Sequence, residues 1–119
     1  MKKLLLLFTL LVLVISCQKA ILEKPAKLID EDKMVNILFD ITVLEAIKQV
    51  NPTALMERKI TTSNYIYKKY QIDSLQFAQN DKYYASDVKN YAKMYDEVAK
   101  RIDENKLQLD TEKSKNPAK

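Results

Sequence analysis

The complete absence of glycine limits the folds open to this chain more than any other feature of its sequence. Tight hairpin turns and phosphate-binding loops need backbone positions with positive φ, which glycine adopts at low cost. The sequence therefore excludes P-loop and dinucleotide-binding sites, and it favours turns made by Pro, Asn, Asp and Ser. Histidine is also absent, and the single cysteine can form neither an intrachain disulfide nor a thiolate cluster. We expect no cofactor, no metal site and no enzyme activity.

The first residues of the chain have the features of an export signal. Lys2 and Lys3 precede an apolar run, Leu4 to Ile15, that only Thr9 interrupts. As a helix these twelve residues span about 18 Å, short of the roughly 30 Å hydrocarbon core, so a signal peptide is favoured over a membrane-spanning helix. The run ends in Val14-Ile15-Ser16-Cys17, which resembles a bacterial lipobox. We predict cleavage after residue 16 and lipidation of Cys17; the alternative is an ordinary secreted protein with a chance cysteine.

A lipidated Cys17 would attach the mature chain to a membrane without a spanning segment. It would carry a diacylglyceryl group and an N-acyl chain, and two or more chains anchor a protein stably. Gln18 stands where an Asp would resemble inner-membrane retention, and no acidic cluster follows directly. Both features favour the outer membrane and its periplasmic face. Cleavage removes Lys2 and Lys3 and lowers the net charge from +4 to +2. Because the remaining basic and acidic residues are interspersed along the chain, we expect no nucleic-acid partner.

Composition divides the mature chain into three parts. Residues 17–27 are expected to form a lipidated tether, because they contain Pro25 and show no apolar periodicity. Residues 28–109 form one helical domain with room for one small core. Residues 110–119 are polar, contain Pro117 and are expected to be a disordered tail.

The first predicted helix runs from Asp30 or Glu31 to about Gln49 and is apolar on two sides. One face carries Met34, Ile37, Leu38, Ile41 and Leu44, and the nearly opposite face carries Val35, Phe39, Val43, Ala46 and Val50. Such a helix is either enclosed within the bundle or covered by a partner. We expect enclosure.

Three further helices are predicted. Asn51-Pro52 opens the second, whose apolar stripe extends to Tyr70 through Met56, Ile60, Ser63 and Tyr67. A capping box from Asp73 to Gln76 opens the third, which ends near Tyr84. Ser86 is expected to cap the fourth, whose stripe consists of Val88, Tyr91, Tyr95, Val98, Ile102, Asn105 and Leu109. No stretch alternates as a strand does. The prediction is an all-α fold, a small bundle of three to four helices.

Two carboxylates are the candidates for chemistry. Asp40 and Glu45 are separated by about 140° around a helix, so they cannot jointly flank one scissile bond. Glu45 is expected to pair with Lys48 or with tyrosine hydroxyls at the end of the core; the alternative is a buried carboxylate of raised pKa in a ligand cleft. Asp40 shares a polar ridge with Asn36, which favours a structural hydrogen-bonding site.

All seven tyrosines fall between Tyr65 and Tyr95. Helix packing accounts for those on the apolar stripes. Tyr65 points away from its stripe, and Tyr83 and Tyr84 cannot both face inward. Exposed together, these three could form a stacking platform for a glycan or a peptide.

Several short segments resemble a family of small Bacteroidota lipoproteins that carry the domain of unknown function numbered 4296. The matching segments are Pro25 with Leu28-Ile29, Met34, Ile37-Leu38-x-Asp40-Ile41, Glu45-Ala46, Tyr70 to Ser74, Gln76-Phe77, Tyr83-Tyr84 and Val88 to Val98. They cover about residues 25–105. Gln71 stands where members often have Gly, which implies a less sharp turn. The resemblance implies a lipid anchor and a helical fold, and it implies no activity.

These features favour a non-catalytic, lipid-anchored module that binds or scaffolds another envelope protein. The second apolar face around Phe39 is its candidate contact surface. The alternative function is binding of peptidoglycan or another envelope glycan through Tyr65, Tyr83 and Tyr84. An enzyme that uses Asp40 or Glu45 is a third hypothesis.

Overall fold

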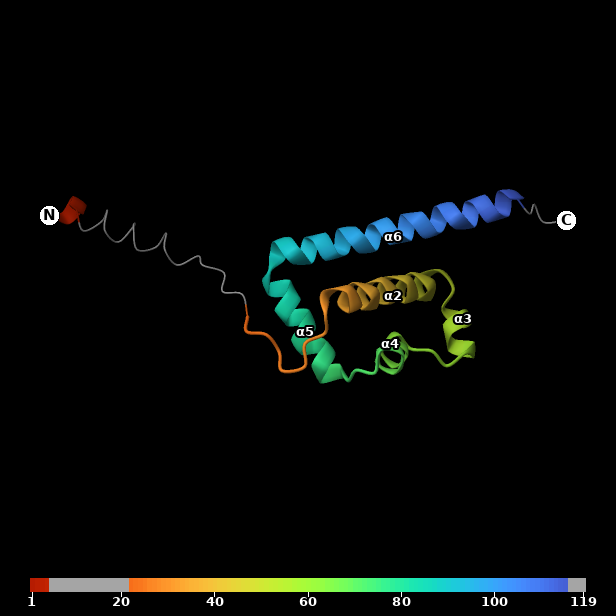
Figure 1. Ribbon diagram of the computed structural model, residues 1–119, viewed down its shortest axis with the longest axis horizontal. Helices are drawn as coiled ribbons and strands as arrows, with labels where there is room; N and C mark the ends of the chain where they lie inside the picture. Colours follow the sequence, from red (N-terminus) through yellow and green to blue (C-terminus); the bar gives the residue numbers. More distant parts are fainter. Residues whose placement is uncertain (5–21, 116–119) are drawn as a thin grey trace.

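The fold is all-α, as predicted, in the part of the chain that the structure describes. This structure, a computed structural model, describes residues 1–4 and 22–115. Its helices beyond the N-terminal turn are α2 (Glu31–Val50), α3 (Pro52–Glu57), α4 (Thr62–Tyr70), α5 (Ser74–Ser86) and α6 (Val88–Lys115), shown in Figure 1. None of the described helices is both long and apolar enough to cross a membrane. Cys17 and the predicted cleavage site lie outside the described residues.

Polar side chains start every one of these helices. Asp30 Oδ1 accepts from the Lys33 amide at 2.9 Å and Asp73 Oδ1 from the Gln76 amide at 2.7 Å. Asn51 caps α3, with Pro52 in the first turn. These caps satisfy amide groups that the first helical turn leaves free. Short polar residues therefore start the helices, as the absence of glycine predicts.

The predicted second helix is two helices. Residues 58–61 separate α3 from α4, because the chain leaves α3 with Lys59 in the left-handed region at φ 54°. Thr61 then begins a new helix by accepting the Asn64 amide at 3.2 Å. The predicted continuous apolar stripe from Met56 to Tyr70 is therefore wrong. Leu55 and Ile66 are the buried residues, and Met56 is exposed.

The junction of α5 and α6 also differs from the prediction. Ser86 is the last residue of α5, where its hydroxyl donates to the Tyr83 carbonyl at 2.6 Å. Asp87 is the cap of α6, since its carboxylate accepts the Asn90 amide at 3.1 Å.

The end of α6 contradicts the predicted disordered tail as far as Lys115. Residues 110–115 are helical because no Pro or Gly interrupts them before Pro117, and the Thr111 hydroxyl donates to the Leu107 carbonyl at 2.7 Å. The remaining four residues lie outside the described part.

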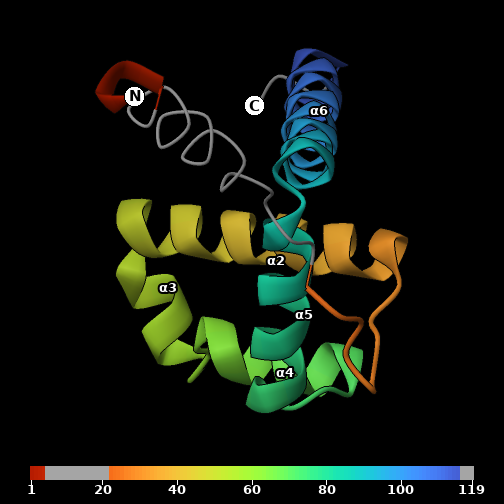
Figure 2. The ribbon, with the colours of Figure 1, turned by 90° about the vertical axis from the view of Figure 1, so that its left-hand side faces the viewer.

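Helix α2 is enclosed through its first half, as expected. In Figure 2, α6 lies on one side of it, α3 and α4 lie on the other, and α5 runs past it from the start of α6. Residues from both apolar faces are buried, among them Val35, Ile37 and Leu38. The predicted second face opens toward the C-terminus, where Ala46 and Val50 are exposed.

The core-facing stripe of α6 matches the predicted one at Tyr91, Val98 and Ile102 but not at Tyr95 or at Val88, which is exposed. Met94 and Val98 are buried, whereas Tyr95 is 44% exposed. Tyr95 instead packs edge-on against Tyr91, with ring centroids 5.1 Å apart. The flexible Met94 side chain fills the core in its place.

The last residues of the predicted tether are fixed to α5. Lys27 O accepts from Asn80 Nδ2 at 2.9 Å, and Ile29 N donates to Asn80 Oδ1 at 2.7 Å. The Tyr84 hydroxyl donates to Ile29 O at 2.6 Å. We call Asn80 and Tyr84, with these bonds, the α5 clamp. Farther back, Leu22 N donates to Ser86 Oγ at 3.1 Å, so residues 22–27 of the predicted tether lie against the helical domain.

Candidate functional site

Two hollows flank the C-terminal half of α2, and Val43 lines both. The α3 cleft, of about 370 Å³, is lined by Asp40, Val43, Leu44, Ile47, Ala54, Leu55, Arg58, Ile60 and Tyr65. The α6 groove, of about 440 Å³, is lined by Phe39, Val43, Ile102, Asn105, Lys106, Gln108, Leu109 and Glu112. The predicted site residues Phe39, Asp40 and Tyr65 therefore line two separate hollows.

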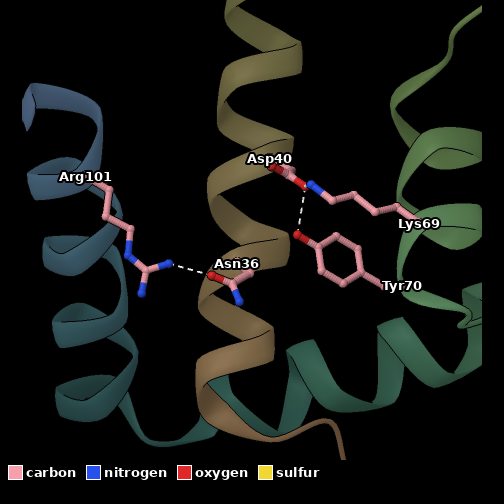
Figure 3. Close-up of polar contacts among 5 residues, drawn as sticks. All are labelled: Asn36, Asp40, Lys69, Tyr70 and Arg101. Atoms are coloured by element: carbon pink, nitrogen blue, oxygen red, sulfur yellow. Dashed lines mark hydrogen bonds and ion pairs between the residues drawn. The ribbon is translucent and has the colours of Figure 1, made fainter. Parts of the chain in front are cut away.

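Asp40 joins α2 to α4. Its Oδ2 accepts from Lys69 Nζ at 2.6 Å and from the Tyr70 hydroxyl at 2.7 Å, as Figure 3 shows. The Asp40 side chain is only 14% exposed. The Lys69 ammonium also lies 5.5 Å from the Tyr65 ring centroid and 5.3 Å from that of Tyr70, so cation–π attraction supports the ion pair.

The protonation of this cluster follows from its contacts. Hydrogen bonding to Asp40 raises the pKa of Lys69 above its ordinary value. Burial, and after it the hydrogen bond to Asp40, raises the pKa of Tyr70 to about 12. At neutral pH Lys69 is therefore charged and Tyr70 is a neutral donor. Asp40 therefore forms structural hydrogen bonds, as predicted from the sequence.

Asn36 lies one turn before Asp40 on α2, but its side chain binds a different neighbour. Figure 3 shows its side chain directed toward α6, where Arg101 Nη1 donates to Asn36 Oδ1. The two polar residues therefore bind opposite neighbours of α2. One holds α6 and the other holds α4.

Glu45 pairs with Lys48, one of the two predicted arrangements. Lys48 Nζ lies 3.6 Å from Glu45 Oε2, and the Thr62 hydroxyl, rather than a tyrosine, donates to Glu45 Oε1 at 2.6 Å. The Thr62 hydrogen bond is the main cause that lowers the pKa of Glu45. The alternative of a carboxylate with a raised pKa is therefore wrong, because donors stabilise the charged form of a side chain that water reaches.

The three tyrosines proposed as a platform do not form one. Tyr84 is buried, at 7% exposure, because its hydroxyl belongs to the α5 clamp. Burial raises the pKa of this hydroxyl. Tyr83 packs edge-on against it and lines a hollow beside the segment from Leu22 to Ala26, whereas Tyr65 lines the α3 cleft. Tyr84 cannot stack on a ligand, and the other two face different hollows.

The most buried polar side chain, Asn80, was missed as a site residue. It is fully buried, and its amide also donates to the Gln76 carbonyl at 2.8 Å. The spacing of Gln76, Asn80 and Tyr84 at every fourth residue was an available signal, since it places three polar groups on one helix face. Lys69 and Arg101 were also missed, because their partners lie 29 and 65 residues away along the chain.

The described residues offer little for metal chemistry. Within residues 1–4 and 22–115, no three His, Cys, Asp or Glu side chains are grouped so that they could hold a metal ion. The hydroxyl of Tyr91 donates to Asp81 at 2.6 Å, which engages another carboxylate. Burial, with this bond, raises the pKa of Tyr91. The polar clusters join helices, and the open surfaces beside α2 are mainly apolar.

Comparison with known proteins identifies one protein family to which the chain is similar. The model of a protein family described as "Domain of unknown function (DUF4296)" matches residues 25–108, more than two thirds of the chain. The match includes the α5 clamp, the Asp40 cluster and all of the α6 groove except Leu109 and Glu112. No curated protein and no solved structure matches the chain.

Proposed function

The chain belongs to the family described as Domain of unknown function (DUF4296), and from that premise we propose that it is a lipid-anchored, non-catalytic module that binds another protein of the cell envelope. The sequence Val14-Ile15-Ser16-Cys17 after a short apolar run supports the anchor. Gln18 after the cysteine supports the outer membrane, facing the periplasm. The species group of such lipoproteins, Bacteroidota, is part of the same proposal.

The α6 groove is the observation that carries the binding role. Ile102 and Leu109 on α6 face Phe39 and Val43 on α2 across this hollow. Leu109 is 57% exposed although it is a large apolar residue. An exposed apolar groove of this kind marks an interaction surface in many proteins.

The expected occupant is an amphipathic helix of the partner protein. On α6, Val98, Ile102, Asn105 and Leu109 follow the alternating three- and four-residue spacing with which one helix packs against another. The early part of this stripe is buried in the interface with α2, and the later part lines the open groove. A helix laid in the groove would continue the packing that α2 begins.

The engaged carboxylates support the absence of catalysis. Asp40 is held by Lys69 and Tyr70, and Glu45 is held by Thr62 and Lys48. The Thr62 hydrogen bond lowers the pKa of Glu45, whereas a general acid that works at neutral pH needs a raised one.

The proposal is tested by photo-cross-linking in cells from two positions on α6. Benzoylphenylalanine at Leu109 should give a cross-linked band with another envelope protein. The same residue at Leu107, which is 68% exposed and does not line the groove, is the matched control. Leu109→Glu should abolish co-purification of the partner, because it places a charge in an apolar contact, and Leu107→Glu should retain it.

Two outcomes would contradict the proposal. Equal cross-linking from both positions would mean that the groove does not select a partner. A band that contains only a second copy of the chain would mean that the groove mediates self-association and does not bind another envelope protein.

A further inference from the structure

The chain enters the folded body at one end of the molecule, beside the junction of α5 and α6. Leu22 N is bound to Ser86 Oγ, and a hollow of about 470 Å³ lies between the segment from Leu22 to Ala26 and the α5 residues Gln79, Lys82 and Tyr83. Figure 1 shows this segment passing beside α5, and it shows α6 running from the same junction toward the opposite end. The entry point and the start of α6 therefore share one end.

Little chain separates this end from Cys17. Only Gln18 to Ile21 stand between Cys17 and Leu22. A fully extended chain rises at most about 3.6 Å per residue, so the two Cα atoms lie within about 18 Å of each other. With Cys17 lipidated, this end of the body must stay near the phospholipid headgroups.

The side chains at this end suit a phospholipid surface. Lys24, Lys82 and Lys89 are exposed, and in the described part of the chain none of them forms an ion pair. Val88 is 56% exposed, and Leu22 is exposed as well. Two exposed acidic residues accompany them: Glu23, and Glu31, whose Oε2 accepts from Asn90 Nδ2 in the first turn of α6. The Asp87 carboxylate caps α6. Cationic side chains with apolar neighbours bind anionic headgroups and reach the apolar boundary below them.

We propose that this surface, the anchor-side pole formed by Leu22, Lys24, Lys82, Val88 and Lys89, rests on the phospholipid headgroups. Helix α6 then leads away from the membrane. At about 1.5 Å per residue, the stretch from Ile102 to Leu109 begins about 20 Å along α6 from Val88 and ends about 30 Å along it. The α6 groove is therefore presented to a partner above the membrane surface. This inference rests on the lipid anchor of the proposed function.

The test compares two labelled positions on α6 in the full, lipidated protein. Because lipid occupies the thiol of Cys17, the variants Val88→Cys and Leu107→Cys each carry one reactive thiol for a fluorophore. The labelled proteins are placed in vesicles of phosphatidylethanolamine and phosphatidylglycerol that contain a lipid with a nitroxide on its headgroup. We expect loss of fluorescence at position 88 and none at position 107.

A charge reversal separates headgroup attraction from simple proximity. Lys82→Glu with Lys89→Glu should reduce the quenching at position 88. The matched pair Lys100→Glu with Lys113→Glu, on exposed turns of α6 away from the pole, should leave it unchanged.

The outcomes distinguish the orientation from the anchor. Equal quenching at both positions would mean that α6 lies flat on the membrane, and it would overturn the inference while the anchor stands. An unchanged signal in the Lys82→Glu, Lys89→Glu variant would also overturn it. If mass spectrometry finds no lipid on Cys17 and the protein stays out of the membrane fraction, the anchor fails and the orientation fails with it.

Discussion

Gln71 takes the backbone conformation that usually belongs to glycine. It ends α4 with φ 54° and ψ 49°, which is the left-handed region, and its own side chain amide donates to the Lys68 carbonyl at 2.8 Å. A residue with a Cβ atom pays roughly 1–2 kcal/mol for this conformation. The resemblance to a family with Gly at this position implied a less sharp turn here. That expectation is wrong, because Gln71 makes the left-handed turn at a cost in free energy.

Gln71→Gly should therefore stabilise the fold by about 1 kcal/mol, because glycine enters the left-handed region without a steric penalty. The measurement is the free energy of unfolding in urea. Gln71→Ala removes the same side-chain hydrogen bond but keeps the Cβ atom, and it should give no gain. A gain of equal size in both variants would assign the effect to the side chain rather than to the backbone.

Loss of the Asn80 side chain should destabilise the fold strongly, because this side chain is fully buried and fully bonded. Asn80→Ala would leave the Ile29 amide and the Lys27 carbonyl without partners where water does not reach easily, and it should destabilise the fold by about 3 kcal/mol. Thermal and urea unfolding measure this loss. Asn90→Ala is the control, since Asn90 Nδ2 donates to Glu31 Oε2 at an exposed position, and it should change stability by less than about 0.5 kcal/mol. Similar losses in both variants would argue against the α5 clamp.

At the scale of helices, the predictable part was the start of α2, α3 and α5. Caps at Asp30, Asn51 and Asp73 are local, since each side chain binds the amide three residues ahead. The break between α3 and α4 was not predictable from apolar spacing, because a three- and four-residue stripe continues across residues 58–61 whether or not the helix does. In the stripe of α6 the core position predicted for Tyr95 belongs to Met94, because both residues are large and only tertiary packing decides which of two neighbours turns inward.

For the candidate site residues, too, contacts within one helix were predictable and contacts between helices were not. The Glu45–Lys48 pair is three residues apart and was predicted, whereas the partners of Asp40 and Asn36 come from other helices. The burial of Tyr84 depends on a carbonyl 55 residues earlier, which no local pattern reveals.

The last turns of α6 should unfold independently of the core. Every residue from Asp103 to Lys115 is exposed, so these turns add few buried contacts. Asp110→Pro should remove amide-exchange protection from about residue 107 onward, while the global free energy of unfolding changes by less than about 0.5 kcal/mol. Ala99→Pro, beside the buried Val98, should instead cost about 3 kcal/mol or more. A large global loss in Asp110→Pro would show that the end of α6 supports the core.

At the scale of the whole molecule, three tyrosines link stability to alkaline pH. Folding raises the pKa of Tyr70 to about 12 and also raises the pKa values of Tyr84 and Tyr91. A raised pKa in the folded state means that the contribution to stability is complete below the unfolded value of about 10 and falls as pH rises through the folded value.

We therefore expect the tyrosines to make stability independent of pH near neutrality and to make it fall steeply above about pH 10. Circular dichroism reports unfolding, and the ultraviolet absorbance of tyrosinate reports ionisation; the two should change together. Tyr84→Phe should make the loss of stability above about pH 10 smaller. Tyr95→Phe is the control and should have a weaker effect, because Tyr95 is more exposed than Tyr84. Ionisation of all seven tyrosines before any unfolding would contradict this link.

The α5 clamp also determines how the molecule bears mechanical load. A pull on the N-terminal side of the chain reaches Leu22 first and then Lys27 and Ile29, whose backbone groups are bound to Ser86, Asn80 and Tyr84. Tension from a membrane attachment would therefore pass into α5, through several hydrogen bonds loaded together, before it could unwind the first turn of α2. A pull on the N-terminal side therefore loads the α5 clamp before it loads α2, one of the two helices that flank the α6 groove.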